Sequence, residues 1–233
     1  TRDALGSIAA MLLANPAGAF FRNLHYWAGQ LCLVLTLIHV WDHLRAGTEH
    51  RVSRGVWLRL ALTLPLLAFI MLSGFLLRGD ADASQASRIL TEATSQIPLL
   101  GPIAATMIFG AGERLDVIYV QHAATATIAV WLFIIEHARR GVWPRASAFV
   151  AVTVVTSAIS LGFSPGLHDG LEPVIKGPWY FLGLQEILHW TPWPLVVVLA
   201  GFAIIGALYA VRVIAAPRAA WSKALLPFLA LAY

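Results

Sequence analysis

The chain has 233 residues, of which 59% are hydrophobic and only 12% are charged. Soluble domains carry about 25% charged residues, so this composition excludes an ordinary soluble domain and predicts a polytopic helical membrane protein. The formal net charge of +4 comes from Lys and Arg clustered between apolar runs, which indicates membrane topology rather than nucleic-acid binding. The single cysteine, Cys32, excludes an internal disulfide.

The first 21 residues are apolar but too short to cross a bilayer. The run from Leu5 to Ala14 would form roughly 15 Å of helix, and Asn15-Pro16 should end it. We therefore expect an amphipathic surface helix that leads into the first span.

Five later stretches are apolar and long enough to be spans. Their expected bounds are 24–44, 56–77, 115–137, 146–163 and 195–212. The long connection 78–114 should hold two short helices, and the connection 164–194 contains Gly177-Pro178-Trp179-Tyr180. The loops after the first, third and fifth spans are basic, which places them in the cytoplasm. The first and third spans then run in the same direction, with both long connections on the outer face.

The first and third spans each carry two histidines. His25 and His39 are fourteen residues apart, which separates them by about 21 Å along a helix and leaves them broadly on one face. His122 and His137 are fifteen residues apart, or about 22 Å. An ionisable side chain inside hydrocarbon is costly and indicates a functional site. Two parallel spans then offer His25 with His122 near the outer face, and His39 with His137 near the inner face.

These two pairs are too far apart for one binuclear metal site, but each could hold a large planar cofactor. An iron macrocycle ligated by one imidazole from each span has no open position for oxygen chemistry, so it would transfer electrons. His43 forms a His-x3-His pair with His39, which could indicate a small-metal site, but its place at the helix end beside Asp42 and Arg45 favours a solvated or propionate-side role. The remaining histidines, His50, His168 and His189, are expected in loops or at span ends with interfacial roles.

At these positions the sequence resembles the cytochrome b subunits of the quinol-oxidising cytochrome bc complexes, over nearly the whole chain. Arg22-Asn23-Leu24-His25 is similar to the R-N-L-H that opens the family's second helix. The segment 97–101 resembles the family's I-P-Y-I-G hairpin on the outer face. Lys176-Gly177-Pro178-Trp179-Tyr180-Phe181-Leu182 resembles the P-E-W-Y-F-L segment near the outer quinol site.

The resemblance implies an all-α transmembrane bundle with about five full spans and two b-type haems. His25 and His122 would ligate the outer haem iron, and His39 and His137 the inner one. It also implies a haem-bearing unit at 1–143 and a second unit at 144–233 with the G-P-W-Y loop.

The same resemblance implies roles for five further residues. Arg22 would lie near a haem propionate, and Gly74 would let its helix pass close to a haem. The other three, Pro178, Trp179 and Tyr180, would line a quinone site.

The departures from the family concern one missing helix and the outer quinol site. The family's first helix has no counterpart, so another subunit could supply it. Pro178 replaces the glutamate of P-E-W-Y and cannot accept a quinol proton. The family's P-W-G is replaced by Leu77-Arg78-Gly79-Asp80. Carboxylates that could substitute for the glutamate are Glu172, Asp169, Glu186 and Asp80.

The predicted function is a dihaem subunit that moves electrons across a bacterial inner membrane between quinone and a periplasmic partner, such as a Rieske-type protein or a c-type cytochrome. The altered outer site favours a conduit with one quinone site over a bifurcating quinol oxidase, and the sequence leaves both open. One alternative is the dihaem anchor of a formate dehydrogenase, nitrate reductase or hydrogenase, whose histidine spacings differ. Another is a non-haem scaffold or transporter, which the fourfold histidine pattern disfavours.

Overall fold

A computed structural model describes residues 3–110, 114–171, 173–191, 193 and 195–214. Over these ranges the chain is all-helical and contains no strand. The helices are α1 (Ala4–Ala14), α2 (Pro16–Arg45), α3 (Thr48–Arg51), α4 (Arg54–Leu76), α5 (Ala81–Ser95), α6 (Gly101–Phe109), α7 (Leu115–Ala138), α8 (Ala146–Gly162), the 3₁₀ turn η1 (Trp179–Phe181), α9 (Leu182–Trp190) and α10 (Leu195–Ile214).

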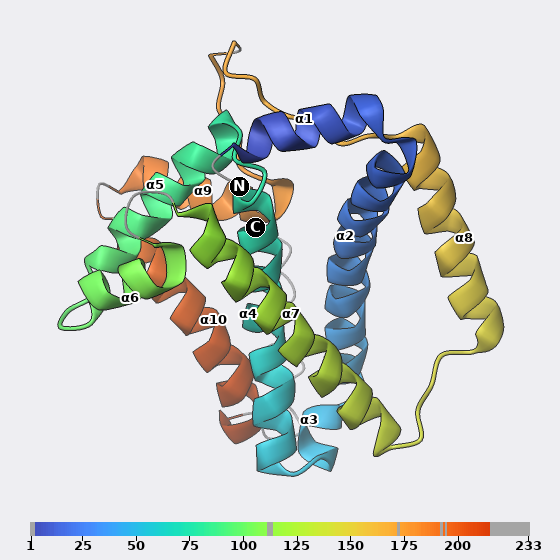
Figure 1. The fold of residues 1–233 in the computed structure, drawn as a ribbon. Helices are drawn as coiled ribbons and strands as arrows, with labels where there is room; N and C mark the ends of the chain where they lie inside the picture. The colour runs from blue at the N-terminus through green and yellow to red at the C-terminus, as the bar shows by residue number, and fades with distance from the viewer. Residues whose placement is uncertain (1–2, 111–113, 172, 192, 194, 215–233) are drawn as a thin grey trace.

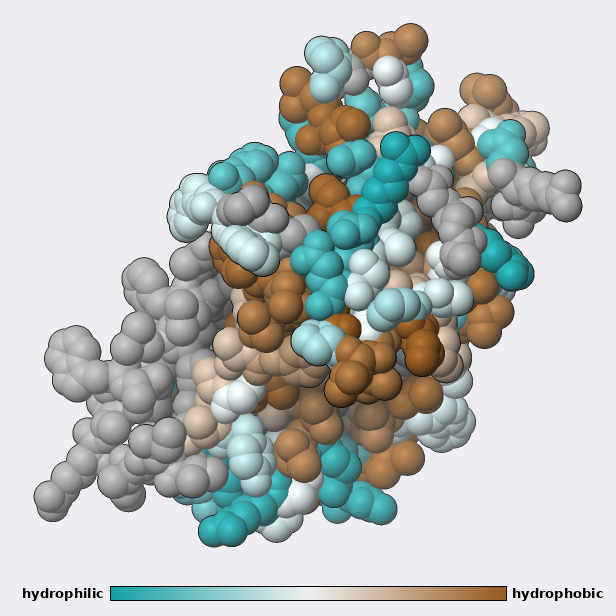
Figure 2. All heavy atoms as spheres, turned by 90° about the vertical axis from the view of Figure 1, so that its left-hand side faces the viewer, coloured by the Kyte–Doolittle hydropathy of each residue, from teal (hydrophilic) through white to brown (hydrophobic). Residues whose placement is uncertain are grey.

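Three helices are long and apolar enough to cross a membrane, namely α2 with 30 residues, α4 with 23 and α7 with 24. A hydrocarbon core about 30 Å thick needs about 20 apolar residues of helix. The apolar stretches Ala146–Gly162 of α8 and Val198–Ala210 of α10 are shorter. Three of the five expected spans are therefore supported, and the spanning of α8 and α10 stays a prediction. On the face shown in Figure 2, apolar side chains gather across the middle and polar ones toward both ends.

The start of the chain differs from expectation in two ways. α2 begins at Pro16 rather than near Leu24. A helix needs no N–H at its first position, and the fixed φ of proline suits a helix start. The side chain of Asn15 caps α2 by accepting a hydrogen bond from the Gly18 N–H at 2.9 Å. α1 ends at Ala14 as expected, but it contains no charged residue, so it is apolar rather than amphipathic.

The helices alternate in direction, so α2 and α7 run the same way (Figure 1). α1 lies across one end of the bundle, on the side of the α5–α6 hairpin, and α3 lies at the opposite end. We refer to these as the α1 end and the α3 end. The hairpin of two short helices was expected for the connection 78–114, and the structure confirms it. The division into units 1–143 and 144–233 stays a prediction.

α4 is the central helix, packed against α7, α10 and α5. At the α3 end, the Trp57 indole donates to the Leu208 carbonyl at 2.9 Å, and Arg59 pairs with the buried Glu136 of α7 at 2.8 Å. The buried cluster at this end comprises Leu44, Trp57, Ala61 and Leu208. The cluster at the α1 end comprises Phe75, Leu76, Ala83, Phe109 and Ile118. α4 is thus fixed at both ends, which sets its register against α7.

α8 stands at the edge of the bundle and packs on α2 (Figure 1). Asn23 on α2 is 7% exposed, and its amide donates to the Ser160 carbonyl at 3.2 Å. Its side-chain oxygen accepts from Ser164 Oγ at 3.2 Å, while the Trp27 indole donates to the Phe163 carbonyl at 2.8 Å. Lipid removes the hydrophobic drive for helix association, so such hydrogen bonds and close packing hold helices together. The asparagine of the R-N-L-H segment is therefore a helix-packing residue.

Replacing Asn23 by alanine should loosen α8 from α2. Both interhelical hydrogen bonds of Asn23 would be lost, at a cost of roughly 1 kcal/mol in the membrane. Thermal unfolding in detergent should start earlier, and protease should cleave the connection after α8 faster. Thr153→Ala is the matched control, because Thr153 bonds only to Phe149 of its own helix and is exposed. Equal cleavage of the two variants would contradict this role for Asn23.

Candidate functional site

His25 on α2 and His122 on α7 face each other toward the α1 end. Their ring centroids are 6.0 Å apart and their planes lie at 80°. The ring of His122 is oriented by α4, because its Nδ1 lies 3.0 Å from the buried Ser73 Oγ. The next residue, Gly74, leaves room for this ring, since a Cβ there would lie 3.0 Å from His122 Cε1. The structure thus brings together three residues that the sequence singled out.

His39 and His137 form a second pair toward the α3 end. Their ring centroids are 6.2 Å apart and their planes lie at 28°. A third ring joins them, because His43 Nε2 lies 3.0 Å from His39 Nε2. The other nitrogen of His43 lies 3.1 Å from Thr48 Oγ1. His43, for which a solvated or propionate-side role was expected, is thus in direct contact with a candidate ligand.

The hydrogen bonds on α7 fix which nitrogen of each imidazole carries a proton. His137 Nδ1 lies 2.7 Å from the Phe133 carbonyl, which can only accept, so Nδ1 is protonated. The Ser73 hydroxyl donates to the Phe69 carbonyl at 2.8 Å, so it accepts from the Nδ1–H of His122. A neutral imidazole with a protonated Nδ1 has its lone pair on Nε2. Both α7 histidines therefore present a nitrogen able to bind a metal, in the tautomer that a backbone or hydroxyl partner selects.

The histidine face of α2 is open, since both His25 and His39 are exposed. Within the described ranges, no group of three or more His, Cys, Asp or Glu side chains is placed to hold a metal ion. The site chemistry is therefore that of imidazole pairs, which suits a cofactor that supplies its other ligands itself.

Arg22 lies half-buried one turn before His25. Its guanidinium donates to the Pro165 carbonyl at 3.1 Å, in the connection that follows α8. This contact ties the start of α2 to that connection. A place beside a haem propionate stays a prediction for Arg22.

The G-P-W-Y segment lies across α2 and α4. The Trp179 indole donates to Gln30 Oε1 at 2.7 Å, and the Tyr180 hydroxyl donates to the Met71 carbonyl at 3.2 Å. Burial raises the pKa of the Tyr180 phenol, so this group stays neutral and remains a donor. Two aromatic side chains thus fasten the segment to the two helices beside the His25–His122 pair.

A cavity of about 100 Å³ lies between this segment and α5. Pro178 lines it, whereas Trp179 and Tyr180 do not, so only one of the three candidate quinone residues faces this space. The described lining residues are mostly apolar, and among them Asp82 is the only ionisable one. They are Leu72, Asp82, Gln85, Ala86, Ile89, Leu90, Ala93, Ile175, Gly177, Pro178, Phe181, Gln185 and Leu188.

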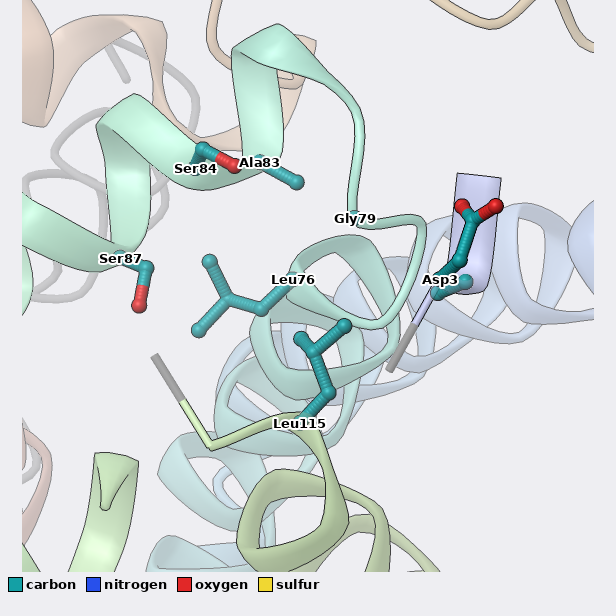
Figure 3. A pocket seen from close by; sticks show the side chains of 8 residues that line it. Asp3, Leu76, Gly79, Ala83, Ser84, Ser87 and Leu115 are labelled. Carbon is teal, nitrogen blue, oxygen red and sulfur yellow. The ribbon is translucent and has the colours of Figure 1, made fainter. Parts of the chain in front are cut away.

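A second cavity of about 180 Å³ lies at the α1 end, and none of the four paired histidines lines it. Figure 3 shows Ser84 and Ser87 of α5 on one side, Leu76 and Leu115 beside them, and Asp3 across from them. The carboxylate of Asp3 caps α1 by accepting from the Gly6 N–H at 2.7 Å. This cavity is thus a junction between α1 and the start of α5.

The four carboxylates considered as substitutes for the missing glutamate lie in different places. Asp80 is 1% exposed and fully engaged: it pairs with Arg78, caps α5 through the Ala83 N–H and accepts from the His168 N–H at 3.1 Å. Asp169 and Glu186 are exposed. Glu172 lies outside the described residues. None of the three described candidates lines the cavity beside Pro178.

Sequence reasoning missed Asp82 and His168. Asp82 lines the cavity, and His168 packs against it from the connection after α8, with His168 Nδ1 3.4 Å from Asp82 Oδ1. The signal available in the sequence was the Arg78-Gly79-Asp80-Ala81-Asp82 run, which concentrates three charged residues directly after an apolar helix. His168 could not be placed beside it, because 86 residues separate the two positions.

Comparison with known proteins narrows the class of this helical membrane protein. No protein-family model matches the chain. The chain is 26% identical over 124 residues to cytochrome b6 of Heliomicrobium gestii and 27% identical over 124 residues to that of Heliobacterium mobile, in each case 52% of this chain and 58% of the relative. It is 24% identical over 96 residues to the menaquinol:cytochrome c reductase cytochrome b subunit of Geobacillus thermodenitrificans, covering 41% of this chain and 43% of that protein.

Over the described ranges the chain is all-helical, with three helices long and apolar enough to cross a membrane. Over about half its length it is similar to bc-type cytochrome b subunits, which confirms the resemblance drawn from the sequence. The matches span a little over half the length of the cytochrome b6 relatives.

Two Arg-x-Asp ion pairs, one buried and one exposed, allow a matched test of how burial changes the effect of an ion pair on stability. Asp80 is buried beside Arg78, whereas the side chains of Arg114 and Asp116 are both 60% exposed. Asp80→Asn should clearly lower stability, because the largely buried Arg78 would lose its nearest carboxylate and keep only the more distant Asp82 at 3.9 Å. Asp116→Asn should leave stability unchanged, because solvent screens an exposed pair. Thermal unfolding in detergent compares them, and equal midpoints would contradict the structural role of Asp80.

Proposed function

We propose that this chain is the dihaem electron-transfer subunit of a bc-like membrane complex. One b-type haem would lie between His25 and His122, and the other between His39 and His137. The observation that carries the proposal is the meeting of α2 and α7 histidines in two pairs, each at one depth, with ring centroids about 6 Å apart. Two spans that run in the same direction are needed for this arrangement.

The residues of each pair fit axial ligation of haem iron. The protonated Nδ1 atoms of His122 and His137 leave their Nε2 atoms free to ligate. Bound haem iron with two imidazole ligands supplies one-electron transfer. At the second pair, the ring of His43 has to turn from His39 to release its Nε2. Gly74 supports the first site by keeping the space beside His122 clear.

The orientation in the membrane follows from charge. The segments at the α3 end are rich in arginine, which favours the cytoplasmic side of a bacterial inner membrane. The basic residues there include Arg45, Arg51, Arg54, Arg139 and Arg140. The α1 end, with the G-P-W-Y segment, would then face the periplasm. Electrons would pass between a quinone and a periplasmic redox partner, such as a Rieske-type protein or a c-type cytochrome.

Histidine variants test the pairing directly. His25→Ala and His122→Ala should each abolish the same haem, because each removes one of its two iron ligands. His39→Ala and His137→Ala should abolish the other haem. Haem content per chain and optical redox titration of membranes measure both signals. His189→Ala, an exposed residue beside Glu186, is the control and should retain both haems. Joint loss of one haem in His25→Ala and His39→Ala would show that the pairing is wrong.

Gly74→Val should remove the haem of the His25–His122 pair alone. The added side chain would occupy the space beside His122 Cε1 and displace the ring. Gly201→Val in α10 is the matched control, because a Cβ there meets no atom within 4 Å. The measurement is the optical signal of each haem, divided by the amount of protein in the membrane. Retention of both haems in Gly74→Val would mean that the haem does not depend on this position of His122.

A further inference from the structure

We propose that Asp82 is the proton acceptor for a quinol at the cavity beside Pro178, and that His168 carries the proton onward. The inference rests on the proposed function, since it assumes that the chain exchanges electrons with quinol. It assigns to a different part of the chain the carboxylate that position 178 lacks.

The cavity has the composition of a small-molecule site. Ligand pockets are mostly apolar, with a few polar groups that fix the orientation of the ligand. Among the described residues of the lining, Asp82 is the single ionisable side chain, and the amides of Gln85 and Gln185 are the other polar groups. A benzene ring needs a cavity of roughly 150 Å³, so a quinol ring needs more than the 100 Å³ present. Side-chain rotamer changes at a binding site are common, and such changes would enlarge the cavity for a quinol ring.

The carboxylate of Asp82 is held in place by its surroundings. Its Oδ1 accepts from the Lys176 N–H at 2.9 Å, which ties α5 to the segment that leads into Gly177-Pro178. The charged groups that face it are Arg78, at 3.9 Å from Oδ2, and His168, at 3.4 Å from Oδ1. Asp80 lies in the same network through Arg78. The side chain of Asp82 is 13% exposed, so this carboxylate is screened from bulk water but open to the cavity.

His168 is the independent sign that protons move here. Its side chain is 10% exposed, and neither ring nitrogen makes a hydrogen bond to any described residue. The 3.4 Å contact with Asp82 is within ion-pair range but lacks hydrogen-bond geometry. A buried polar group without a partner is costly, and such a group in a native protein calls for an explanation. Imidazole gains and loses a proton near neutral pH, so a His168 that takes a proton from Asp82 explains both its burial and its position.

The proposed step transfers one proton and no electron. The O–H bond of one quinol hydroxyl breaks, a new O–H bond forms on a carboxylate oxygen of Asp82, and the quinol becomes a quinolate anion. Asp82 then passes the proton to His168 and is regenerated as a carboxylate. The quinolate would then lose its second hydroxyl proton to water and its two electrons one at a time, which leaves a quinone. One electron would pass to the haem proposed between His25 and His122, and the other to the periplasmic redox partner of the proposed function. The Arg78 guanidinium lies 3.9 Å from Asp82 Oδ2, on the same side of the cavity.

The test is the rate at which a short-chain quinol reduces the haem of the His25–His122 pair in membranes that hold the whole complex. Asp82→Asn preserves shape and can still accept from the Lys176 N–H, but it cannot take a proton. It should slow the reduction at least tenfold with the haem spectra unchanged, because general-base catalysis contributes about 10²–10⁴-fold. Asp82→Glu should restore part of the rate. In the control variants Asp169→Asn and Glu186→Gln, the quinol should reduce the haem at the original rate.

His168→Gln keeps the fold of α5 intact and tests the onward step if Asp82→Asn does not accumulate. It should slow the reduction and change how the rate depends on pH, which a purely structural role would not do. An unchanged rate in Asp82→Asn, or an unchanged pH profile in His168→Gln, would overturn the inference, as would slow reduction in either carboxylate control. Failure of the proposed function looks different: the unmodified protein would lack haem or would show no reduction by quinol at all.

Discussion

The cost of burying an imidazole in hydrocarbon is the constraint on which this structure depends. Four histidines on two membrane helices can be accommodated only if their rings meet partners, and α2 and α7 provide this by running in the same direction. The alignment depends in turn on α4, which packs against α7 and is fixed at both ends by Trp57, by the Arg59–Glu136 pair and by the cluster around Leu76. Helix packing therefore sets the depth at which each pair of rings meets.

α4 also acts on one of these rings chemically. The Ser73 hydroxyl donates a hydrogen bond to the Phe69 carbonyl of its own helix and accepts one from His122. The following residue, Gly74, leaves space for the His122 ring. One turn of α4 thus selects both the tautomer and the position of His122. His137 obtains its tautomer from a carbonyl of its own helix, so it needs no such help. The two α7 histidines therefore have the same tautomer but owe it to different hydrogen-bond acceptors.

Sequence periodicity was sufficient for the parts of the site that lie on single helices. The spacing of His25 and His39 along one helix, and the parity of the basic loops, predicted which rings would meet, because both follow from the regular rise and turn of a helix. The start of α2 at Pro16 was missed, since proline reads as a helix breaker unless it occupies the first position. Residues joined across long connections were also missed: Asn23 bonds to Ser160, and Asp82 meets His168. Periodicity within one helix contains no information about such contacts.

The two departures from the family sequence lie next to each other in space, which gives them a common physical explanation. The Arg78-Gly79-Asp80 corner ends α4 and begins α5, and the segment before Pro178 comes from a connection about a hundred residues later. Asp80 binds the His168 N–H and Asp82 binds the Lys176 N–H, so the charged corner holds the later connection at two points. A proline at position 178 removes a carboxylate from one wall of the cavity, while the corner introduces a carboxylate into another. A site altered in this paired way would keep a carboxylate beside the cavity, so the absence of one motif glutamate does not by itself argue against the proposed quinol chemistry.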